Sequence, residues 1–395
     1  MRLRTLTFNA WAIPFAARDV QFRVSALGKA LVEVGPDIVG FQELVVDHAR
    51  ETILDAARAM GLEWHYFRSN SVGSGLAILS RYRIQQTDFF LYRPRGKVQR
   101  LDHMDYYAGK GVGLIRVLTP EGLLDVYNTQ TISKYGPDFM EEYKAYRVAQ
   151  VLSMADWIHS QSMGIPVIAL GDFNMRPDNL EYRIVSDLGE LRDSYVIANP
   201  GDKGYTSTLD NIYRIQRGDW IEHRIDYIFF RNGETSALNV ISSDVVLRQM
   251  PGELNGQARP YSDHYGVLTE FDFHSSTKSS QYPQISKGRK EEVLVEAIQI
   301  LERGKSDAEH RESQHRTLSV IAAVATLAIL ELKVSSRLSR RDAFAKAMWF
   351  LLLVAAACYS LLEGMLGFHF VGEELTDLDN ALESASQSLK VIKRV

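Results

Sequence analysis

One stretch of the chain joins an apolar run to polar residues, and it restricts the fold more than any other feature. Residues 165–170 are almost wholly apolar, and their length and composition predict a buried β-strand. Gly171-Asp172-Phe173-Asn174 follows directly. Because residues two apart on an extended backbone point the same way, we expect Asp172 and Asn174 to face one site and Phe173 to enter the core. Such a carboxylate and amide pair suits a hard cation or a phosphate oxygen, and a common turn is the alternative.

The composition limits the classes of protein to which the chain can belong. With 395 residues, 46% of them hydrophobic and 24% charged, the chain is long enough for about two domains with packed cores. The net charge of -4 provides no basic field, so we expect no nucleic acid partner. A single cysteine, Cys358, excludes a disulfide within the chain and fits a reducing compartment. The first residues lack the apolar run of a signal peptide, which predicts a cytosolic catalytic domain.

Strand-like and helix-like segments alternate along the first 273 residues. We expect helices at 22–34, 47–60 and 138–160, and strands at 3–8, 38–41, 76–79, 111–117, 123–129, 167–170, 224–230 and 267–273. The segment 89–108, rich in Tyr, Arg and Asp, looks like a loop. This order predicts an α/β sandwich of two sheets with outer helices.

The composition changes beyond the last predicted strand. Residues 274–290 are rich in Ser, Lys and Gln and predict a linker between a catalytic domain at 1–273 and a helical region at 291–395. Two segments of the helical region, about 318–332 and 347–362, are apolar on all sides. Each is at or just below the ~20 residues that cross a bilayer, and such helices must be buried in protein or lipid. We therefore expect a membrane hairpin, with a protein-buried hairpin as the alternative.

The charges around this hairpin leave its topology open. Arg337, Arg340 and Arg341 lie in the loop 333–346 and favour a cytosolic loop by the positive-inside rule. Two membrane-crossing helices attached to a cytosolic catalytic domain would place that loop on the far side. A re-entrant or interfacial hairpin reconciles the two expectations. In either case we expect an intracellular membrane, that of the endoplasmic reticulum or another endomembrane.

Polar residues recur where predicted strands end, and sites built from several strand ends are common in α/β folds. Glu43 supplies a hard carboxylate, and one or two carboxylates with substrate oxygens and water usually hold Mg²⁺. His264, beside Asp263, could activate water as a general base. Asp226 could accept from the other ring nitrogen, and Asn9 could bind phosphate without adding negative charge.

Each of these residues also has an ordinary structural interpretation. Glu43 could be a solvated residue near a loop, and Asn9 could end its strand in a turn. The Asp263-His264 pair could belong to a capped turn, and Asp226 could pair with Arg224. Only the combination of these residues and their order along the chain favour a catalytic site over these separate structural interpretations.

That combination resembles the motifs of the endonuclease/exonuclease/phosphatase superfamily. The motifs, in order, are Phe8-Asn9-Ala10-Trp11, Gln42-Glu43, Gly171-Asp172-Phe173-Asn174, Arg224-Ile225-Asp226-Tyr227 and Ser262-Asp263-His264. Within the superfamily, the chain is most similar to the neutral sphingomyelinases and the inositol phosphosphingolipid phospholipases C. This closer resemblance spans roughly residues 3–272 and is carried by segments 9–14, 67–69, 73–76, 105–110 and 146–150.

The resemblance implies a four-layer α-β-β-α sandwich of the DNase I type and Mg²⁺-dependent hydrolysis of a phosphodiester, with Mn²⁺ as the second candidate ion. Three groups of site residues are predicted: catalytic His264, Asp172, Asn174, Asp226 and Lys110; phosphate-binding or substrate-binding Asn9, Gln130 and Asp105; and metal-binding Glu43, Asp263 and Asn9. Asp226 would support His264 as the base, and Lys110 could contact the phosphate or the leaving group, or be a solvated loop cation.

One position departs from the family pattern, which usually has a histidine after the strand at 123–129. This chain has Gln130 there, and Ile132 where a second histidine is common. Glutamine can donate a hydrogen bond to phosphate but cannot release a proton. Removing general-acid help costs about 10²–10⁴-fold in rate. Lys110, water or the metal could substitute, the site could be slower, or the substrate could differ.

The leading functional prediction is a membrane-attached, Mg²⁺-dependent phospholipase C acting on a phosphosphingolipid, either sphingomyelin or an inositol phosphosphingolipid. Ceramide and a phosphorylated head group would be the products. A nuclease or phosphoinositide phosphatase of the same superfamily is an alternative, although the acidic net charge disfavours a nuclease. A catalytically impaired lipid-binding protein is a third possibility, because of Gln130.

Overall fold

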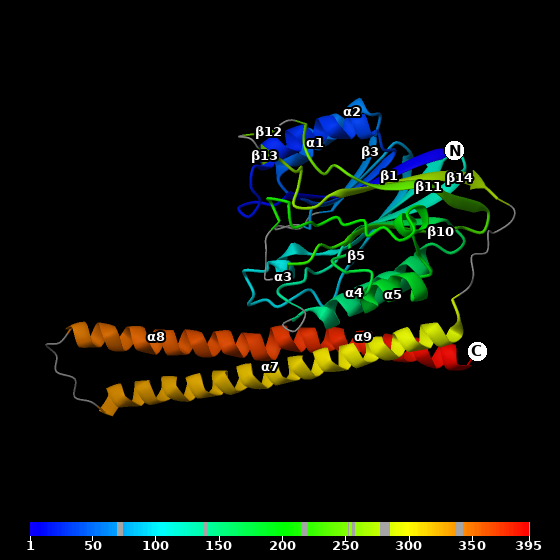
Figure 1. Cartoon of the computed structure of the whole chain (residues 1–395). Helices are drawn as coiled ribbons and strands as arrows, with labels where there is room; N and C mark the ends of the chain where they lie inside the picture. Colours follow the sequence, from blue (N-terminus) through cyan, green and yellow to red (C-terminus); the bar gives the residue numbers. More distant parts are fainter. Residues whose placement is uncertain are drawn as a thin grey trace.

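Two six-stranded sheets, each containing parallel and antiparallel pairs, face each other, and helices cover both outer faces (Figure 1). The predicted four-layer α-β-β-α sandwich is therefore confirmed. The computed structural model describes residues 1–68, 74–137, 141–214, 220–251, 253–254, 257–276, 285–335 and 343–394.

The first sheet has the strand order β11-β14-β1-β2-β4-β3. Its strands are β1 (Arg2–Ala12), β2 (Ile38–Leu44), β3 (Trp64–Arg68), β4 (Leu76–Ser80), β11 (Ser236–Val246) and β14 (Gly266–Ser275). Helices α1 (Val20–Val34) and α2 (Asp47–Ala59) cover its outer face, where Leu27, Leu31 and Ile53 are buried against it. A short hairpin of β12 (Glu253–Leu254) and β13 (Gln257–Ala258) precedes β14.

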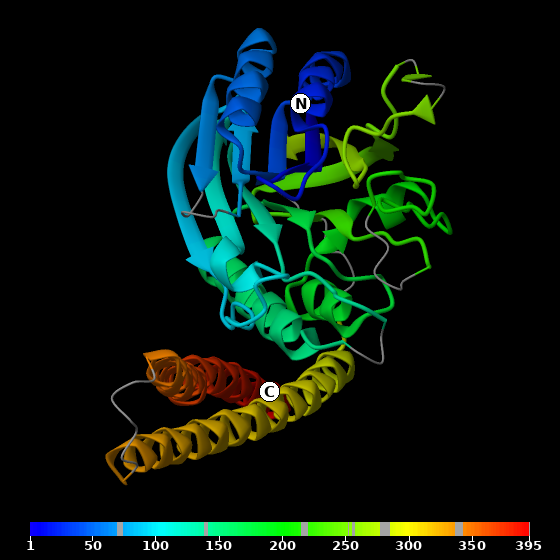
Figure 2. The same cartoon turned by 90° about the vertical axis from the view of Figure 1, so that its left-hand side faces the viewer.

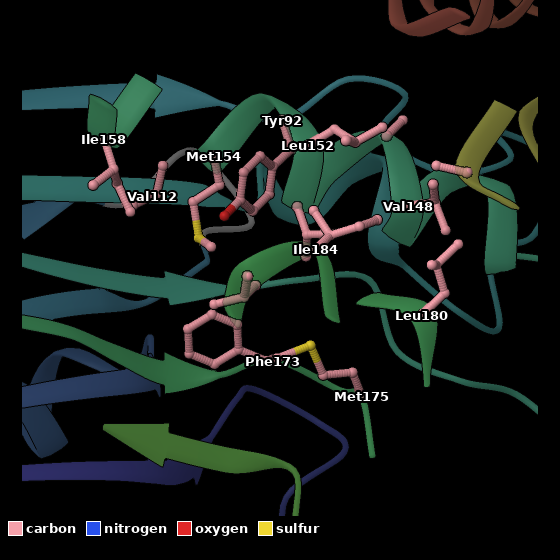
Figure 3. Packing of buried hydrophobic residues seen from close by; sticks show 14 of the residues in the cluster. Tyr92, Val112, Val148, Leu152, Met154, Ile158, Phe173, Met175, Leu180 and Ile184 are labelled. Atoms are coloured by element: carbon pink, nitrogen blue, oxygen red, sulfur yellow. The ribbon is translucent and has the colours of Figure 1, made fainter. Parts of the chain in front are cut away.

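The second sheet has the order β5-β6-β7-β8-β10-β9. Its strands are β5 (Arg83–Leu91), β6 (Gly111–Thr119), β7 (Gly122–Gln130), β8 (Val167–Asp172), β9 (Arg192–Asp193) and β10 (Asp226–Arg231). The helical segments that follow or cover it are α3 (Asp105–Ala108), α4 (Lys144–Gln161), α5 (Leu180–Arg183), the π-helical turn η2 (Ile184–Leu188) and α6 (Ser194–Ala198). Figure 3 shows Val148 and Leu152 of α4 in the same apolar cluster as Phe173 and Ile184.

The space between the sheets is filled mainly by apolar side chains, among them Ile115, Ile168 and Phe271. Gly40 of β2 lies where the sheets approach closely, because a Cβ there would be 2.0 Å from Cδ1 of Leu170. This packing fixes the two sheets relative to each other and so positions side chains at their shared edge.

Several element predictions differ from the structure. The strands β3, β5, β9, β11, β12 and β13 are additional to the predicted ones. The sequence does not indicate β3 and β5 because most of their side chains are exposed or half-buried and show no apolar alternation. In the predicted loop 89–108, the first three residues belong to β5 and the last four form α3. The predicted helix 138–160 begins at Lys144, and residues 138–140 lie outside the described part of the chain.

The C-terminal region forms a long helical hairpin (Figure 1). Its elements are α7 (Lys287–Ser335), α8 (Ala343–Met365), the π-helical turn η3 (Leu366–Phe370) and α9 (Val371–Arg394). A single helix of 49 residues, α7, contains the first predicted apolar segment, 318–332. Both arms of the hairpin are long and apolar enough to cross a membrane, and their most apolar windows are only 6% and 17% buried. Residues 277–284 of the predicted linker 274–290 and residues 336–342 of the basic loop 333–346 lie outside the described part of the chain.

The first half of α7 packs on the sandwich instead of standing apart from it. Val293, Leu294 and Leu301 belong to the same apolar cluster as α4. Gly304 approaches α4 so closely that a Cβ would be 2.3 Å from the Cβ of Ala145. The base of the hairpin is therefore docked on the sandwich, while its tip projects beyond it (Figure 1). Figure 2 shows that the hairpin lies on the side of the sandwich that α4 covers.

Candidate active site

Strand register brings predicted residues from both sheets to one edge of the sandwich. In the second sheet, Asp172 at the end of β8 lies opposite Gln130 of β7 on one side and Asp226 of β10 on the other. Asn9 of β1 and Glu43 of β2 approach from the first sheet. The site is therefore formed where the two sheets face each other at their strand ends.

Asp172 is the most heavily hydrogen-bonded side chain of this group. Its Oδ2 accepts from Asn9 Nδ2 at 3.1 Å and from Asn174 Nδ2 at 3.2 Å. Gln130 Nε2 donates to the same oxygen at 3.3 Å, and the backbone N–H of Asn174 donates to Oδ1 at 3.1 Å. The side-chain amides of Asn9, Gln130 and Asn174 thus all donate to the Asp172 carboxylate and hold its orientation.

The backbone around the site adopts conformations that are rare for residues other than glycine. Glu43 and Asn174 have φ values of 55° and 47°, in the left-handed region. Gly171 has φ 151°, and a Cβ there would be 2.0 Å from the Thr129 carbonyl oxygen, so only glycine fits. Residues other than glycine that adopt left-handed backbone angles often mark functional sites, because the surrounding structure must hold them in this unfavourable conformation.

His264 is paired with Asp226, the carboxylate expected to accept a hydrogen bond from its ring. The Nδ1 of His264 lies 2.9 Å from Asp226 Oδ2. Because an ionised carboxylate only accepts hydrogen bonds, Nδ1 carries the proton and Nε2 is left free to exchange one. Arg224 pairs with Asp193 at 2.5 Å, so the alternative pairing of Asp226 with Arg224 does not occur.

Lys110 and Asp105 form a second buried pair. Lys110 Nζ lies 2.7 Å from Asp105 Oδ1, and it also donates to the Thr131 carbonyl oxygen at 3.1 Å and to Ser133 Oγ at 3.3 Å. Lys110 is therefore a buried, fully bonded ammonium and not a solvated loop cation. Because Thr131 directly follows Gln130, this pair lies next to the group around Asp172.

Gln130 links the two sheets across the site. Its Nε2 donates to Glu43 Oε1 at 2.6 Å, in addition to its bond to Asp172. The side chain is 1% exposed, so both carboxylates are held by the same buried amide. In this arrangement the amide nitrogen of Gln130 contacts two carboxylates of the site.

The carboxylates of the site shift one another's protonation. Burial raises the pKa of Asp172, and the nearby Asp226 adds to the rise. Burial raises the pKa of Asp263 to about 6, with Glu43 adding to the rise. Burial alone would lower the pKa of His264, but Asp226, Asp172 and Asp263 together raise it well above its ordinary value. The site thus has an excess of negative charge that favours a cation.

The donor set fits a hard divalent cation. One ligand atom each from Asp172, Asp226 and His264 lies within 4.8 Å of the others, in the only such cluster found among the described residues. Asp226 Oδ1 is buried and accepts no hydrogen bond from any described group. A buried oxygen without a donor is costly, so it is suited to accept a ligand or a cation. Glu43 and Asp263 add two further carboxylates of the kind that Mg²⁺ prefers.

Two supporting residues are absent from the sequence-based set of candidates. Thr206 Oγ1 accepts from the backbone N–H groups of Ile225 and Asp226, at 3.2 and 3.3 Å, and so anchors the start of β10. Arg23 is fully buried in α1 and donates to the carbonyl oxygens of Ala10, Trp11, Arg18 and Tyr261. Its spacing of four from Leu27 on the buried helix face was the one available signal, whereas Thr206 lies in a loop without a pattern.

With this geometry in view, comparison with known proteins identifies the family. A sequence profile of the Endonuclease/Exonuclease/phosphatase family matches residues 6–264. The chain belongs to this family. The resemblance drawn from the motifs is confirmed, including the likeness to neutral sphingomyelinases and inositol phosphosphingolipid phospholipases C.

Two curated relatives represent these two groups. Sphingomyelin phosphodiesterase 2 of Mus musculus is 30% identical over 276 residues, covering 68% of this chain and 64% of that protein. Inositol phosphosphingolipids phospholipase C of Schizosaccharomyces pombe is 26% identical over 293 residues, covering 68% of each. The chain thus spans slightly less than two thirds of the length of the mouse relative.

Solved structures share the fold at low sequence identity. A mutant of beta toxin from Staphylococcus aureus with bound magnesium ions superposes with a TM-score of 0.53 at 17% identity. The match covers 68% of this chain and 99% of that one. At this identity the likeness concerns the fold alone, and it agrees with the sandwich described above.

Proposed function

We propose that this protein is a membrane-attached, Mg²⁺-dependent phospholipase C that hydrolyses a phosphosphingolipid to ceramide and a phosphorylated head group. The observation that carries the proposal is the His264–Asp226 pair, with its 2.9 Å contact, beside the Asp172 carboxylate. The names of the relatives support the substrate class, since one acts on sphingomyelin and the other on inositol phosphosphingolipids.

The residues of the site suit attack by water on a phosphodiester. Asp226 holds Nδ1–H of His264, so that Nε2, in the neutral form of the ring, can accept a proton from the attacking water. The water oxygen forms a bond to phosphorus, the bond from phosphorus to the ceramide oxygen breaks, and that oxygen gains a proton. Lys110 is a candidate for stabilising the phosphate or the departing oxygen, and Asp172 with Asn174 is a candidate for orienting the water and phosphate.

Mg²⁺ would be held by Glu43 and Asp263, with Asn9 beside them, and Mn²⁺ is the second candidate. When bound, such an ion would polarise a phosphoryl oxygen and stabilise the charge that develops there. Support comes from the excess of carboxylates at the site, where the nearby Glu43 adds to the raised pKa of Asp263. The magnesium ions in beta toxin show that a protein of this fold binds them.

The hairpin of α7 and α8 would attach the protein to an intracellular membrane, with the catalytic site in the cytosol. Support comes from its two apolar arms, whose most apolar windows are only 6% and 17% buried. A lipid substrate resides in the same bilayer, so attachment would raise the encounter rate between site and substrate.

The test is an assay of the purified full chain with sphingomyelin, inositol phosphosphingolipid, a phosphoinositide and DNA, each with Mg²⁺ and with EDTA. We expect Mg²⁺-dependent release of ceramide from one or both sphingolipids. His264→Asn should lower that rate by at least about 10²-fold, because proton transfer contributes that much or more. The matched control His48→Asn, on the exposed surface of α2, should leave it unchanged.

Hydrolysis of DNA or phosphoinositide without hydrolysis of either sphingolipid would overturn the substrate assignment. Binding of sphingolipid without any turnover would instead favour the catalytically impaired lipid-binding protein, for which Gln130 is the motivating residue. An unchanged rate in Asp172→Ala would contradict the placement of the site.

A further inference from the structure

Large apolar side chains are exposed on two loops at one edge of the sandwich. Phe15 in the loop between β1 and α1 is 109% exposed, and Trp220 and Ile221 in the segment before β10 are 67% and 60% exposed. Leu209 and Ile212 in the same segment are also exposed. We call these five residues the mouth patch. Clustered apolar exposure of this kind marks a surface that meets a protein or a membrane.

The mouth patch borders the candidate active site. Arg18, three residues after Phe15, donates through Nη2 to the carbonyl oxygen of Ile212 at 2.7 Å, which joins the two loops. Asn211 Nδ2 donates to the carbonyl oxygen of Ser262 at 2.9 Å, immediately before Asp263. The patch is thus tied by hydrogen bonds to the segment that carries Asp263 and His264.

Further contacts hold the part of the mouth patch around Ile221 and the adjacent Tyr213 in place. Arg214 Nη2 donates to the carbonyl oxygen of Ile221 at 2.7 Å. Tyr213 packs its ring 5.7 Å from that of Trp11 at the end of β1 and donates its hydroxyl to Asp19 at 2.8 Å. These contacts fix the exposed apolar side chains on an ordered surface beside the reaction centre.

The hairpin projects in the direction that the mouth patch faces. Along α7, Arg289 binds Asp187, next to the C-terminal end of α4, whereas Gly304 contacts Ala145 at the N-terminal end of α4. That end of α4 is close to the end of β7, where the site lies. The apolar part of α7 begins another 14 residues on, at Leu318, which is about 20 Å further along the helix.

The pictures agree with this direction. In Figure 1, β1 runs from the marked N-terminus toward the side to which the tip of the hairpin projects. The loop that carries Phe15 follows the end of β1, so it lies at that end of the sandwich. A membrane crossed or entered by the hairpin would therefore face the mouth patch.

We propose that the mouth patch is a membrane-contact surface that docks the active site on the lipid bilayer. The inference rests on the proposed membrane attachment and deepens it, because it names the surface through which a substrate lipid would enter. Trp is favoured at the boundary between head groups and acyl chains, and Arg18 beside the patch can reach lipid phosphates. A protein partner is disfavoured because the proposed membrane attachment would place a bilayer on this side.

The first test measures contact directly. The full chain is reconstituted in phosphatidylcholine vesicles with and without brominated acyl chains, which quench nearby tryptophan fluorescence. We expect Trp220 to contribute to the quenching, so the quenched signal should be smaller in Trp220→Tyr than in the unaltered protein. An equal quenched signal in both proteins would overturn the proposal, and this outcome does not depend on any enzymatic activity.

The second test separates membrane contact from catalysis. The variant Phe15→Ser/Trp220→Ser should hydrolyse sphingomyelin in phosphatidylcholine vesicles about tenfold more slowly than the unaltered protein, because interfacial binding scales with buried apolar area. Its rate on a short-chain, water-soluble sphingomyelin should stay the same. Met163→Ser is the matched control, since Met163 is 81% exposed but precedes β8 at the opposite edge.

The outcomes distinguish the two proposals. Equal losses on both substrates, or no loss on vesicles, would overturn the membrane-contact surface. If the unaltered protein hydrolyses neither substrate, the proposed function fails, and the quenching result alone decides for or against the contact surface.

Discussion

Gln130 occupies the point at which the two sheets meet in the site. Its amide donates to Glu43 of the first sheet at 2.6 Å and to Asp172 of the second at 3.3 Å. A buried amide that holds two carboxylates acts on the orientation of metal-binding groups. The residue that replaces an expected histidine is thus placed to orient Glu43, a proposed Mg²⁺ ligand, and this role requires no proton transfer.

Gln130→Ala should weaken Mg²⁺ binding about 10- to 100-fold, because outer-shell partners of metal ligands typically contribute that much. Isothermal titration of the purified protein with Mg²⁺ measures the effect independently of turnover. Gln85→Ala, at an exposed position of β5, is the control and should bind Mg²⁺ normally. Unchanged affinity in Gln130→Ala would show that the amide does not organise the metal ligands.

The pKa of His264 offers a second measurement at the residue scale. Asp226, Asp172 and Asp263 raise it above its ordinary value of about 6.5. NMR titration of metal-free protein should therefore show a raised pKa, and Asp226→Asn should lower it. The raised pKa stabilises the fold fully below the unfolded-state pKa, and this contribution is lost as the pH rises through the folded-state value. A pKa at or below 6.5 in the metal-free protein would contradict the pairing.

At the scale of elements, α4 connects the site to the hairpin. One of its faces packs on the second sheet behind Asp172, and α7 contacts it at Gly304. Helices approach this closely only where a small residue removes the side chain between them. The position of the hairpin therefore depends on a glycine that carries no obvious signal within a 49-residue helix.

Gly304→Ala should destabilise the docking of α7 by about 1–3 kcal/mol, because the new methyl group overlaps Ala145. Its Cβ would lie 2.3 Å from that of Ala145. Ala145→Gly, which itself costs about 1 kcal/mol in a helix, should relieve the overlap in the double variant. Urea unfolding of the three variants measures the coupling. Additive losses in the double variant would argue against direct contact.

At the scale of the whole molecule, the catalytic sandwich and the C-terminal helices share apolar packing. Val293, Leu294 and Leu301 of α7 are at most 2% exposed and lie in the cluster formed by α4 and the second sheet. Ion pairs reinforce the contact, including Arg289–Asp187 at 2.7 Å and the pair Arg183–Glu296. We therefore propose that the boundary between the catalytic unit and the apolar part of the hairpin lies after residue 317. The predicted linker at 274–290 would then lie within the catalytic unit.

Truncation after residue 290 should lower stability by several kcal/mol, since each large apolar side chain that loses its burial contributes about 1.5–3 kcal/mol. The comparison is a variant in which residues 318–365 are replaced by a flexible linker, so that α9 and the first part of α7 remain. We expect thermal unfolding of the comparison variant near that of the full chain in detergent. Equal melting temperatures for both variants would place the boundary at the predicted linker.

The sequence by itself determined the class of fold and named most of the residues that meet at the candidate site. Strands with apolar interiors and polar ends are recognisable locally, so Asn9, Glu43, Asp172, Asp226 and His264 could be named from their positions. The apolar segments beyond residue 318 were visible for the same reason, because a helix that is apolar all round shows in composition alone. Edge strands such as β3 were not predicted, since exposed strands lack the alternation of apolar and polar residues that indicates a buried face.

Only the tertiary structure decided which groups touch. Gln130 could be expected to bind phosphate, but the approach of the two sheets turns its amide to Glu43 and Asp172. Arg23 and Thr206 hold the site through backbone carbonyl and amide groups, which any sequence supplies. The direction of the hairpin depends on where α7 crosses α4. Such contacts join residues far apart in the chain, and local patterns carry no information about the distances between them.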